Sequence, residues 1–330
     1  MTRAGILTLS LLSLWAAGCS VVPEDDLPAA VQTFAASDEP TPTPSPPSEP
    51  AAPTPAPTPT APAAPTTTPT PVDPLELADG QAPEVPADPT AIAGLLTAAE
   101  ERIRDESLPA ADIADAAHWQ QLIYRRLAEQ PELVQSVVGA LPSHLQPVAE
   151  ANVFAAARLR DLHSGSDPEG DVAVRDLPAW QILEPAPAEE LLGHYAEAEA
   201  ATGVHWSYLA AVNLVETRMG RIRGDSSAGA QGPMQFRPAT WAEWGEGDVN
   251  NPRDAILAAG RYLAWGGMPG DVDGALFRYN RDQRYVDAVR TYAEQMQADP
   301  RAYHGYHHWQ VYFDTGAEHV WLPVGYGAND

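Results

Sequence analysis

A long stretch of this chain has almost nothing to bury. From about Ser37 to Pro74 the sequence consists almost entirely of proline, threonine, alanine and serine. Without apolar side chains, the entropy lost on ordering cannot be offset, so no core forms there. The proline content favours an extended polyproline II conformation of about 3.1 Å per residue, which gives this tract a reach on the order of 100 Å. We therefore expect residues 19–87 to be a disordered tether, although a glycosylated stalk without further function fits the same composition.

The first residues are typical of an export signal followed by a lipid attachment site. Residues 4–18 form an apolar stretch behind Arg3 that is too short to span a bilayer but fits a secretory signal. It ends in Ala16-Ala17-Gly18 directly before Cys19, which resembles a bacterial lipoprotein lipobox with alanine where leucine is usual. The resemblance implies that residues 1–18 are a signal peptide and that the Cys19 sulfur carries a lipid, with acyl chains such as palmitate as the membrane anchor. We then expect an exported protein in the cell envelope, lipid-anchored to the outer face of the bacterial cytoplasmic membrane. The alternative is an ordinary secretory signal with a chance cysteine.

Charge and cysteine content exclude several classes of partner. The 330 residues carry a formal net charge of −26, which disfavours nucleic acid and electrostatic docking on anionic lipid. A mostly uncharged polymer is an easier partner for such a chain than a phosphate-rich one. Cys19 is the single cysteine, so no intrachain disulfide and no cysteine-ligated metal site can form.

Residues 88–163 have a helical pattern. Alanine- and leucine-rich stretches there have apolar residues spaced three to four apart. Prolines at positions 109, 131, 142 and 147 stand at the borders of these stretches, where helices start or stop. We interpret 88–163 as a helical accessory region, followed by a polar loop at 164–171. It is either a structural brace or spacer, or a surface that binds another envelope protein.

A second helical region covers residues 175–313. In one of its stretches, Asn251-Pro252 supplies a cap with proline in the first turn, and Gly266-Gly267 ends the helix. No alternation of apolar and polar residues is long enough to predict a substantial strand. The predicted fold class is therefore mainly α, with residues 314–330 as a C-terminal tail.

An acidic residue on an apolar helix face is the best indication of chemistry. At about 100° per residue, Leu209, Val212, Val215 and Met219 form one apolar arc, and Glu216 falls inside that arc. A carboxyl group placed there leaves bulk water, which disfavours its charged form and raises its pKa, as a general acid working near neutral pH requires. The alternative is a glutamate at the helix edge whose carboxylate reaches solvent or a neighbouring arginine.

The residues after this helix favour a carbohydrate ligand. Small residues between 224 and 232 let the backbone approach a ligand closely. Amide, phenol and apolar side chains follow, and sugars need hydrogen bonds to their hydroxyl and N-acetyl groups as well as apolar contact with their ring faces. Taken singly, each piece is also an ordinary loop, core or capping residue. The candidate substrate contacts are Ser226, Gly229, Met234, Gln235, Tyr279 and Asn280.

In this order and spacing, these residues resemble the catalytic domain of lysozyme-like lytic transglycosylases, which cleave the glycan strands of bacterial peptidoglycan. The family pattern is a catalytic glutamate after an apolar helix, a Ser-x-x-Gly-Ala-x-Gly-x-Met-Gln segment, and a Tyr-Asn pair. These elements correspond to Glu216, residues 226–235 and Tyr279-Asn280. The resemblance covers roughly residues 178–296 and implies a lysozyme-like helical catalytic domain.

The resemblance also implies a mechanism with one carboxyl group. Neutral Glu216 would protonate the oxygen of the β-1,4 bond between N-acetylmuramic acid and N-acetylglucosamine. The resulting carboxylate would then take the proton of the muramoyl C6 hydroxyl, which closes a 1,6-anhydro ring. Tyr279 is expected to orient Glu216 or the acetamido group of the substrate.

No metal or other cofactor is expected. Residues 245–250 are too few for a twelve-residue calcium loop. The histidines at 304, 307 and 308 are interleaved with aromatic residues, so we interpret them as an aromatic cluster rather than a metal site.

Three other functions remain open at this point, one of which is a tethered structural spacer whose residues 88–163 bind another envelope protein. A lysozyme-type muramidase, which is a hydrolase, would need a second carboxylate to position water, and Asp225 and Asp248 are the nearest candidates. A non-catalytic peptidoglycan-binding lipoprotein could also keep this fold. The products released from peptidoglycan distinguish the transglycosylase from the muramidase, and a comparison of wild type with Glu216→Gln identifies a binding protein.

Overall fold

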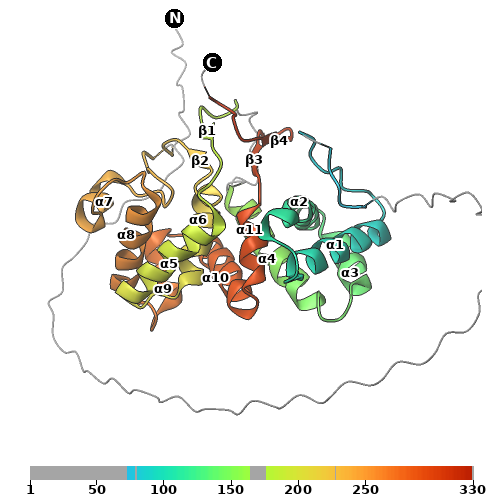
Figure 1. Cartoon of the computed structure of the whole chain (residues 1–330), viewed down its shortest axis with the longest axis horizontal. Coiled ribbons are helices and arrows are strands. Elements are labelled where there is room, and N and C mark those ends of the chain that lie inside the picture. The colour runs from blue at the N-terminus through green and yellow to red at the C-terminus, as the bar shows by residue number, and fades with distance from the viewer. Residues whose placement is uncertain (1–72, 79, 164–175, 227, 329–330) are drawn as a thin grey trace, which may run out of the picture. The chain divides into compact units, whose positions relative to one another are not determined.

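The computed structural model of the chain describes residues 73–78, 80–163, 176–226 and 228–328 (Figure 1). The predicted signal peptide, Cys19 and most of the predicted tether lie outside these residues. The described part is mainly helical, which confirms the predicted fold class. Within it, no helix combines the length and the apolar character that crossing a membrane requires.

The region from residue 88 to residue 163 forms helices with borders close to those predicted. α1 begins after Asp88, whose side chain accepts a hydrogen bond from the Ala91 amide, and proline occupies its first turn, as it does in α3. The elements are α1 (Pro89–Arg104), the 3-10 helix η1 (Ala110–Ile113), α2 (Ala114–Glu129), α3 (Pro131–Ala140) and α4 (Gln146–His163).

The second helical region also follows its predicted caps. The Asn251 side chain accepts hydrogen bonds from two amides of the first turn of α8, and Gly266 follows the last residue of that helix. The elements are α5 (Ala188–Thr202), α6 (Trp206–Thr217), α7 (Pro238–Trp244), α8 (Pro252–Trp265), α9 (Val272–Tyr279), α10 (Gln283–Ala298) and α11 (Arg301–His307).

Two short antiparallel pairs complete the fold (Figure 1). β1 (Gln181–Ile182) pairs with β2 (Ile222–Arg223), just after α6. β3 (Val311–Asp314) and β4 (His319–Leu322) form a hairpin. It crosses the predicted boundary at residue 313, so part of the predicted C-terminal tail is a strand of this hairpin. Ile182, Val311 and Leu322 are buried together in a small second core, so the hairpin packs against the β1 strand.

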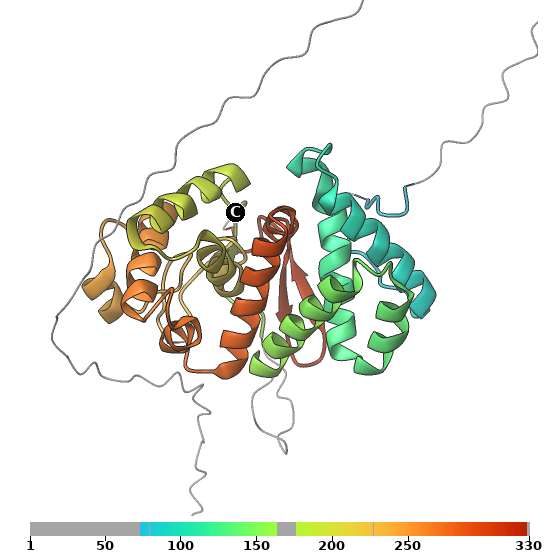
Figure 2. The ribbon, with the colours of Figure 1, turned by 90° about the horizontal axis from the view of Figure 1, so that it is seen from below.

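The helices before and after residue 175 share one apolar core. α10 packs on α6 and also on α4, and Figure 2 shows α4 and α10 side by side. A buried polar cluster adds to this connection. Glu100 of α1 is fully buried and accepts hydrogen bonds from Tyr124 and Gln120 of α2, while the Gln120 side chain accepts a bond of 2.9 Å from the Trp309 indole.

Residues 73–78 and 80–87 lie within the range assigned to the tether, but they contact the helices. Leu75 is fully buried in the main core, and its carbonyl oxygen accepts a hydrogen bond from the Trp119 indole at 3.2 Å. Asp73 forms an ion pair with Arg102 of α1 at 2.6 Å. Leu75 is therefore packed in the core fourteen positions before α1 begins.

Candidate active site

Glu216 lies in the last turn of α6, and its partner comes from a distant helix. The Glu216 residue is half-buried. Its Oε1 atom accepts a hydrogen bond of 2.8 Å from the hydroxyl of Tyr285, which is 1% exposed in the first turn of α10. The packing of α10 on α6 brings these two side chains together across 69 positions of sequence.

The surroundings of Glu216 favour its protonated form at neutral pH. Burial raises the pKa of the carboxyl group from its ordinary value of 4.5 to about 7, and the hydrogen bond from Tyr285 opposes this rise. No neighbouring charge contributes to the shift. The pKa therefore lies where one group can both donate and accept a proton near neutral pH.

The nearby arginines do not neutralise this carboxyl group. The Arg218 guanidinium donates to the Leu214 carbonyl oxygen at 2.8 Å. Arg221 donates to the His307 carbonyl oxygen at 3.1 Å and lies 3.6 Å from a carboxylate oxygen of Glu184. Across the described residues no ion pair includes Glu216, so the structure does not favour the alternative of an arginine-paired glutamate.

A left-handed turn directly after Glu216 directs the chain into the next segment. Arg218, Met219 and Gly220 have φ values of 54°, 61° and 83°, and for the first two this region is sterically unfavourable. Thr217 is buried and secures the turn, because its hydroxyl accepts from the Gly220 amide at 3.0 Å and donates to the Pro233 carbonyl oxygen at 2.6 Å. The end of α6 is thus fixed to the segment that holds the other candidate residues.

Within that segment, Ser226 and Gln235 stabilise the loop itself. The Ser226 hydroxyl oxygen accepts hydrogen bonds from the Ala228 and Ala230 amides at 3.2 and 3.0 Å. The Gln235 side-chain amide donates to the Gly232 carbonyl oxygen at 3.0 Å, and Gln235 itself has a φ of 50°. Both side chains are partly buried, so their first task is to hold the backbone of the loop.

Gly232 is required where it stands. Its φ is 72°, and a Cβ atom there would lie 1.9 Å from the carbonyl oxygen of Val249. Gly229 also has a positive φ, of 73°, but it has open space around the position of a Cβ atom. The glycines of the segment thus allow a left-handed turn at one position and a close approach of two backbone segments at the other.

Met234 and Tyr279 are joined by a hydrogen bond beside Glu216. Met234 is fully buried, so its side chain lies in the core beneath the site rather than on a substrate-facing surface. Its carbonyl oxygen accepts a hydrogen bond of 2.6 Å from the Tyr279 hydroxyl. The hydrogen bond to Glu216 thus comes from Tyr285 and not from Tyr279, and the two rings are parallel at 6.4 Å between centroids. The alternative role of Tyr279, to orient the acetamido group of the substrate, stays a prediction. Burial and the nearby Glu216 raise the pKa of Tyr279.

Aromatic rings continue from Tyr279 toward solvent. The Tyr279 ring contacts Phe236 at 6.1 Å and Tyr262 at 5.7 Å between centroids. Tyr262 in turn contacts Trp265, 5.7 Å away, whose residue is 51% exposed. These rings form a continuous aromatic series from Tyr279, which lies near Glu216, to the exposed Trp265, and sugar rings contact surfaces of this kind.

The remaining candidates lie in loops. Asn280 follows α9, is partly buried, and its side chain makes no hydrogen bond with another described residue. Asp225 accepts from the Gln231 side chain at 3.3 Å, and Asp248 accepts from the Asn250 amide at 2.9 Å, so the two proposed second carboxylates are exposed and bonded locally.

The histidines near the C-terminus pack among aromatic rings. His307 and His308 each contact a backbone carbonyl oxygen through Nε2, at 2.9 and 2.8 Å. Their neighbour Tyr303 contacts the rings of His304 and His307. In the part of the chain that the structure describes, no group of three or more histidine, cysteine, aspartate or glutamate side chains is placed to hold a metal ion.

Tyr285 is the residue that the sequence analysis missed. It lies six positions after Tyr279 and opens a strongly amphipathic helix, where a tyrosine suggests only core packing. One sequence feature could have indicated Tyr285. A helix that starts a few residues after Tyr279-Asn280 keeps its first turn close to that pair, and therefore close to Glu216.

A comparison with known proteins finds similarity to a cell-wall enzyme. Membrane-bound lytic murein transglycosylase F from Thiobacillus denitrificans is 28% identical over 145 residues. The match covers 42% of this chain and 31% of the relative, so the chain spans about a third of that protein's length. No protein-family model and no solved structure matches the chain.

Proposed function

We propose that this chain is a lytic transglycosylase of the cell envelope that cleaves peptidoglycan. The observation that carries the proposal is the half-buried Glu216, held by Tyr285 with a pKa of about 7. The similarity to a lytic murein transglycosylase gives independent support, because it points to the same kind of substrate.

The proposed reaction needs only one carboxyl group. Protonated Glu216 donates its proton to the oxygen that joins N-acetylmuramic acid to N-acetylglucosamine, and the bond from that oxygen to the muramoyl C1 breaks. The substrate's own acetamido group stabilises the positive charge that develops at C1. The Glu216 carboxylate then accepts the proton of the muramoyl C6 hydroxyl, whose oxygen bonds to C1 and closes the 1,6-anhydro ring. Glu216 ends protonated and no water is consumed.

A pKa near 7 suits both halves of this sequence. A carboxyl group with a pKa of 4.5 would be almost fully ionised at neutral pH and unable to act as the acid. A carboxyl group with a much higher pKa would be protonated again by solvent before it could act as the base in the second step. The hydrogen bond from Tyr285 stabilises the carboxylate between the two steps and limits the rise that burial causes.

Nearby groups are suited to hold the sugars. The Asn280 amide is free to bond with an N-acetyl or hydroxyl group, and Gln235 lies in the adjacent loop. The exposed face of Trp265 continues the aromatic series from Tyr279 and would contact a pyranose ring. Ser226 and Gly229 would contribute by fixing the backbone conformation of the loop between residues 226 and 235.

The proposal places the enzyme outside the cytoplasmic membrane, attached through a lipid on Cys19. The residues that precede Cys19 are typical of a lipoprotein signal, and the proline-rich tract would allow the helical part to reach the glycan strands. Radiolabelled palmitate that labels the wild type but not Cys19→Ala would support the anchor.

Product analysis on purified peptidoglycan sacculi tests the activity. Wild type should release muropeptides that end in 1,6-anhydro-muramic acid, which weigh one water less than hydrolysed ends. Glu216→Gln should reduce release by a factor of about 100 or more. Glu132→Gln, on an exposed position of α3, removes a carboxylate elsewhere and should leave release unchanged. Hydrolysed ends would favour a muramidase, and equal slow release by wild type and Glu216→Gln would favour a binding protein.

A further inference from the structure

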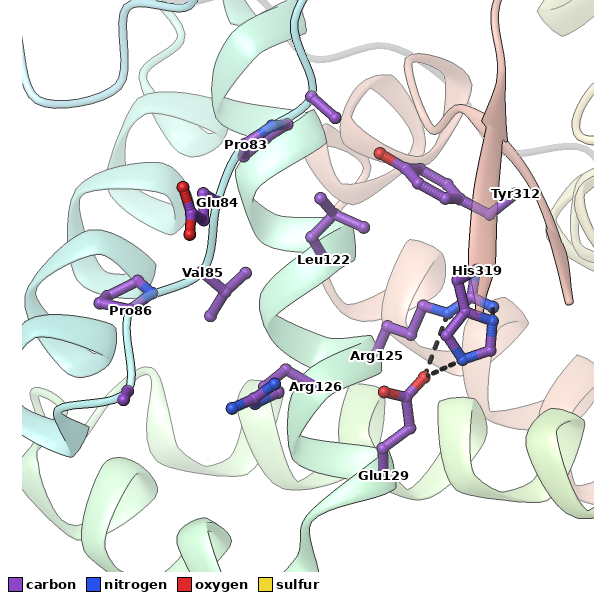
Figure 3. A pocket seen from close by; sticks show the side chains of 12 residues that line it. Pro83, Glu84, Val85, Pro86, Leu122, Arg125, Arg126, Glu129, Tyr312 and His319 are labelled. Atoms are coloured by element: carbon purple, nitrogen blue, oxygen red, sulfur yellow. Dashed lines mark hydrogen bonds and ion pairs between the residues drawn. The ribbon is translucent and has the colours of Figure 1, made fainter. Parts of the chain in front are cut away.

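A pocket of about 630 Å³ lies apart from the residues around Glu216 (Figure 3). One wall is the segment of residues 82–87, another is α2, and the third is the β3–β4 hairpin. None of the candidate substrate contacts lines it. Its volume is in the range of pockets that bind small molecules or short peptides.

One of the two arginines in this pocket has its charge neutralised. Arg125 donates to Glu129 at 3.2 Å, and His319 lies 2.8 Å from the same carboxylate oxygen, as the dashed lines in Figure 3 show. The Arg125 guanidinium also lies over the Tyr312 ring, 5.4 Å from its centroid. This arginine is therefore part of a completed set of interactions.

The second arginine, Arg126, has no such partner. Across the described ranges its side chain makes no ion pair and no hydrogen bond, and its Nε atom is buried. Glu84, on the opposite wall, is exposed and does not pair with it. Arg126 lines the pocket, so an anion bound there would meet a cation that no carboxylate of the described residues neutralises.

Part of the remaining lining is small and apolar, beside the side chains of Glu84, Arg125, Glu129, Tyr312 and His319. Pro83, Val85 and Leu122 line the pocket together with two alanines of the 82–87 segment. A guanidinium donates two parallel hydrogen bonds to a carboxylate, and the C-terminus of a peptide is such a carboxylate. The combination suits a carboxylate with methyl-sized side chains beside it.

We propose that this pocket binds the free carboxylate end of a short, alanine-containing peptide, with Arg126 as the partner of the carboxylate. The identity of the ligand rests on the proposed function, because the peptide stems of peptidoglycan carry such termini. Pro83, Val85 and Leu122 contact the small side chains. The pocket then recognises the peptide part of the polymer whose glycan part Glu216 cleaves.

Isothermal titration of the full chain with N-acetyl-D-alanyl-D-alanine tests this inference. Saturable binding is expected, with at least tenfold weaker binding of the C-terminal amide of the same dipeptide. Arg126→Gln should weaken binding of the acid at least tenfold. Arg290→Gln, which removes a partly exposed arginine of α10, should not change it. Leu122→Trp, which fills the pocket and leaves both arginines in place, should abolish binding.

Several results would overturn the inference. These are the absence of saturable binding, equal binding of acid and amide, or full affinity in both Arg126→Gln and Leu122→Trp. Sodium acetate that binds as tightly as the dipeptide would overturn the peptide part, because the apolar walls would then contribute nothing. If Arg126→Gln does not fold, as judged by circular dichroism, Leu122→Trp alone decides.

The outcome is separable from that of the proposed function. Muropeptide release from sacculi is measured on the same preparations of wild type. Release without dipeptide binding overturns the pocket assignment and leaves the transglycosylase proposal intact. Dipeptide binding without release retains a peptide-carboxylate site and overturns the proposed activity.

Discussion

Replacing Glu216 by glutamine should stabilise the protein in mild alkali and have little effect in acid. Burial raises the pKa of this carboxyl group from 4.5 to about 7, whereas the unfolded chain ionises it near the ordinary value. Between these two values the folded protein binds more protons than the unfolded one, so the free energy of unfolding falls as pH rises. Glutamine has nearly the same size, can accept the Tyr285 hydrogen bond through its carbonyl oxygen, and is uncharged throughout.

The size of the effect follows from the two pKa values. Each pH unit between them is worth about 1.4 kcal/mol. The wild type therefore loses about 3 kcal/mol by pH 8, and less than about 1 kcal/mol by pH 5, because most of the interval lies above that pH. Glu216→Gln escapes this loss, so its advantage over the wild type should grow by about 2–3 kcal/mol between pH 5 and pH 8.

Urea unfolding at the two pH values, followed by far-ultraviolet circular dichroism, measures this difference. Glu132→Gln is the matched control, because its carboxylate is exposed on α3 and its effect should not depend on pH in this way. If Glu216→Gln changed the free energy of unfolding by the same amount at pH 5 and pH 8, the carboxyl group would have an ordinary pKa. The reasoning for a single acid–base residue would then fail.

Two further substitutions test the geometry around the acid. Tyr285→Phe removes the donor that favours the charged form of Glu216, so the alkaline limb of the pH profile of kcat/KM on sacculi should move to higher pH. Tyr279→Phe should leave that limb in place. A limb that moved equally in both variants would count against Tyr285 as the positioning residue. Gly232→Ala should lower the free energy of unfolding by at least about 1–3 kcal/mol. The loss should exceed that of Gly203→Ala, because Gly203 has the same φ of 72° but open space around its Cβ position. Equal losses in urea titrations would mean that the backbone near Val249 moves aside at little cost in free energy.

Local patterns predicted much of the fold because each depends on one segment alone. The spacing of apolar residues around Glu216 places it on a half-buried face wherever α6 packs, and Asn251-Pro252 caps its helix through neighbouring amides. These features need no knowledge of the rest of the chain. The helical fold class and several helix borders could therefore be predicted from sequence.

Contacts between distant segments could not be predicted in this way. The hydrogen bond from Tyr285 to Glu216 exists because α10 packs on α6, and nothing in either segment specifies that pairing. For Met234, the sequence motif does not indicate whether the side chain or the backbone faces the site, and in the structure it is the carbonyl oxygen that bonds to Tyr279. Residues 82–87 have the composition of a tether, yet they form a wall of the Arg126 pocket because α2 supplies the surface on which they lie.

α10 has neighbours on two sides, and this limits how far the protein can be shortened. One side carries Tyr285 to Glu216, and another packs on α4, which precedes the segment that contains Glu216 in the chain. A fragment that starts at residue 175 would expose the α4-facing surface of α10 to solvent and leave this helix free to shift. The proton transfer proposed for Glu216 would then be weakened by a truncation made well outside the sequence motif. The stretch from α1 to α4 is best regarded as a buttress on which the precision of the reaction depends.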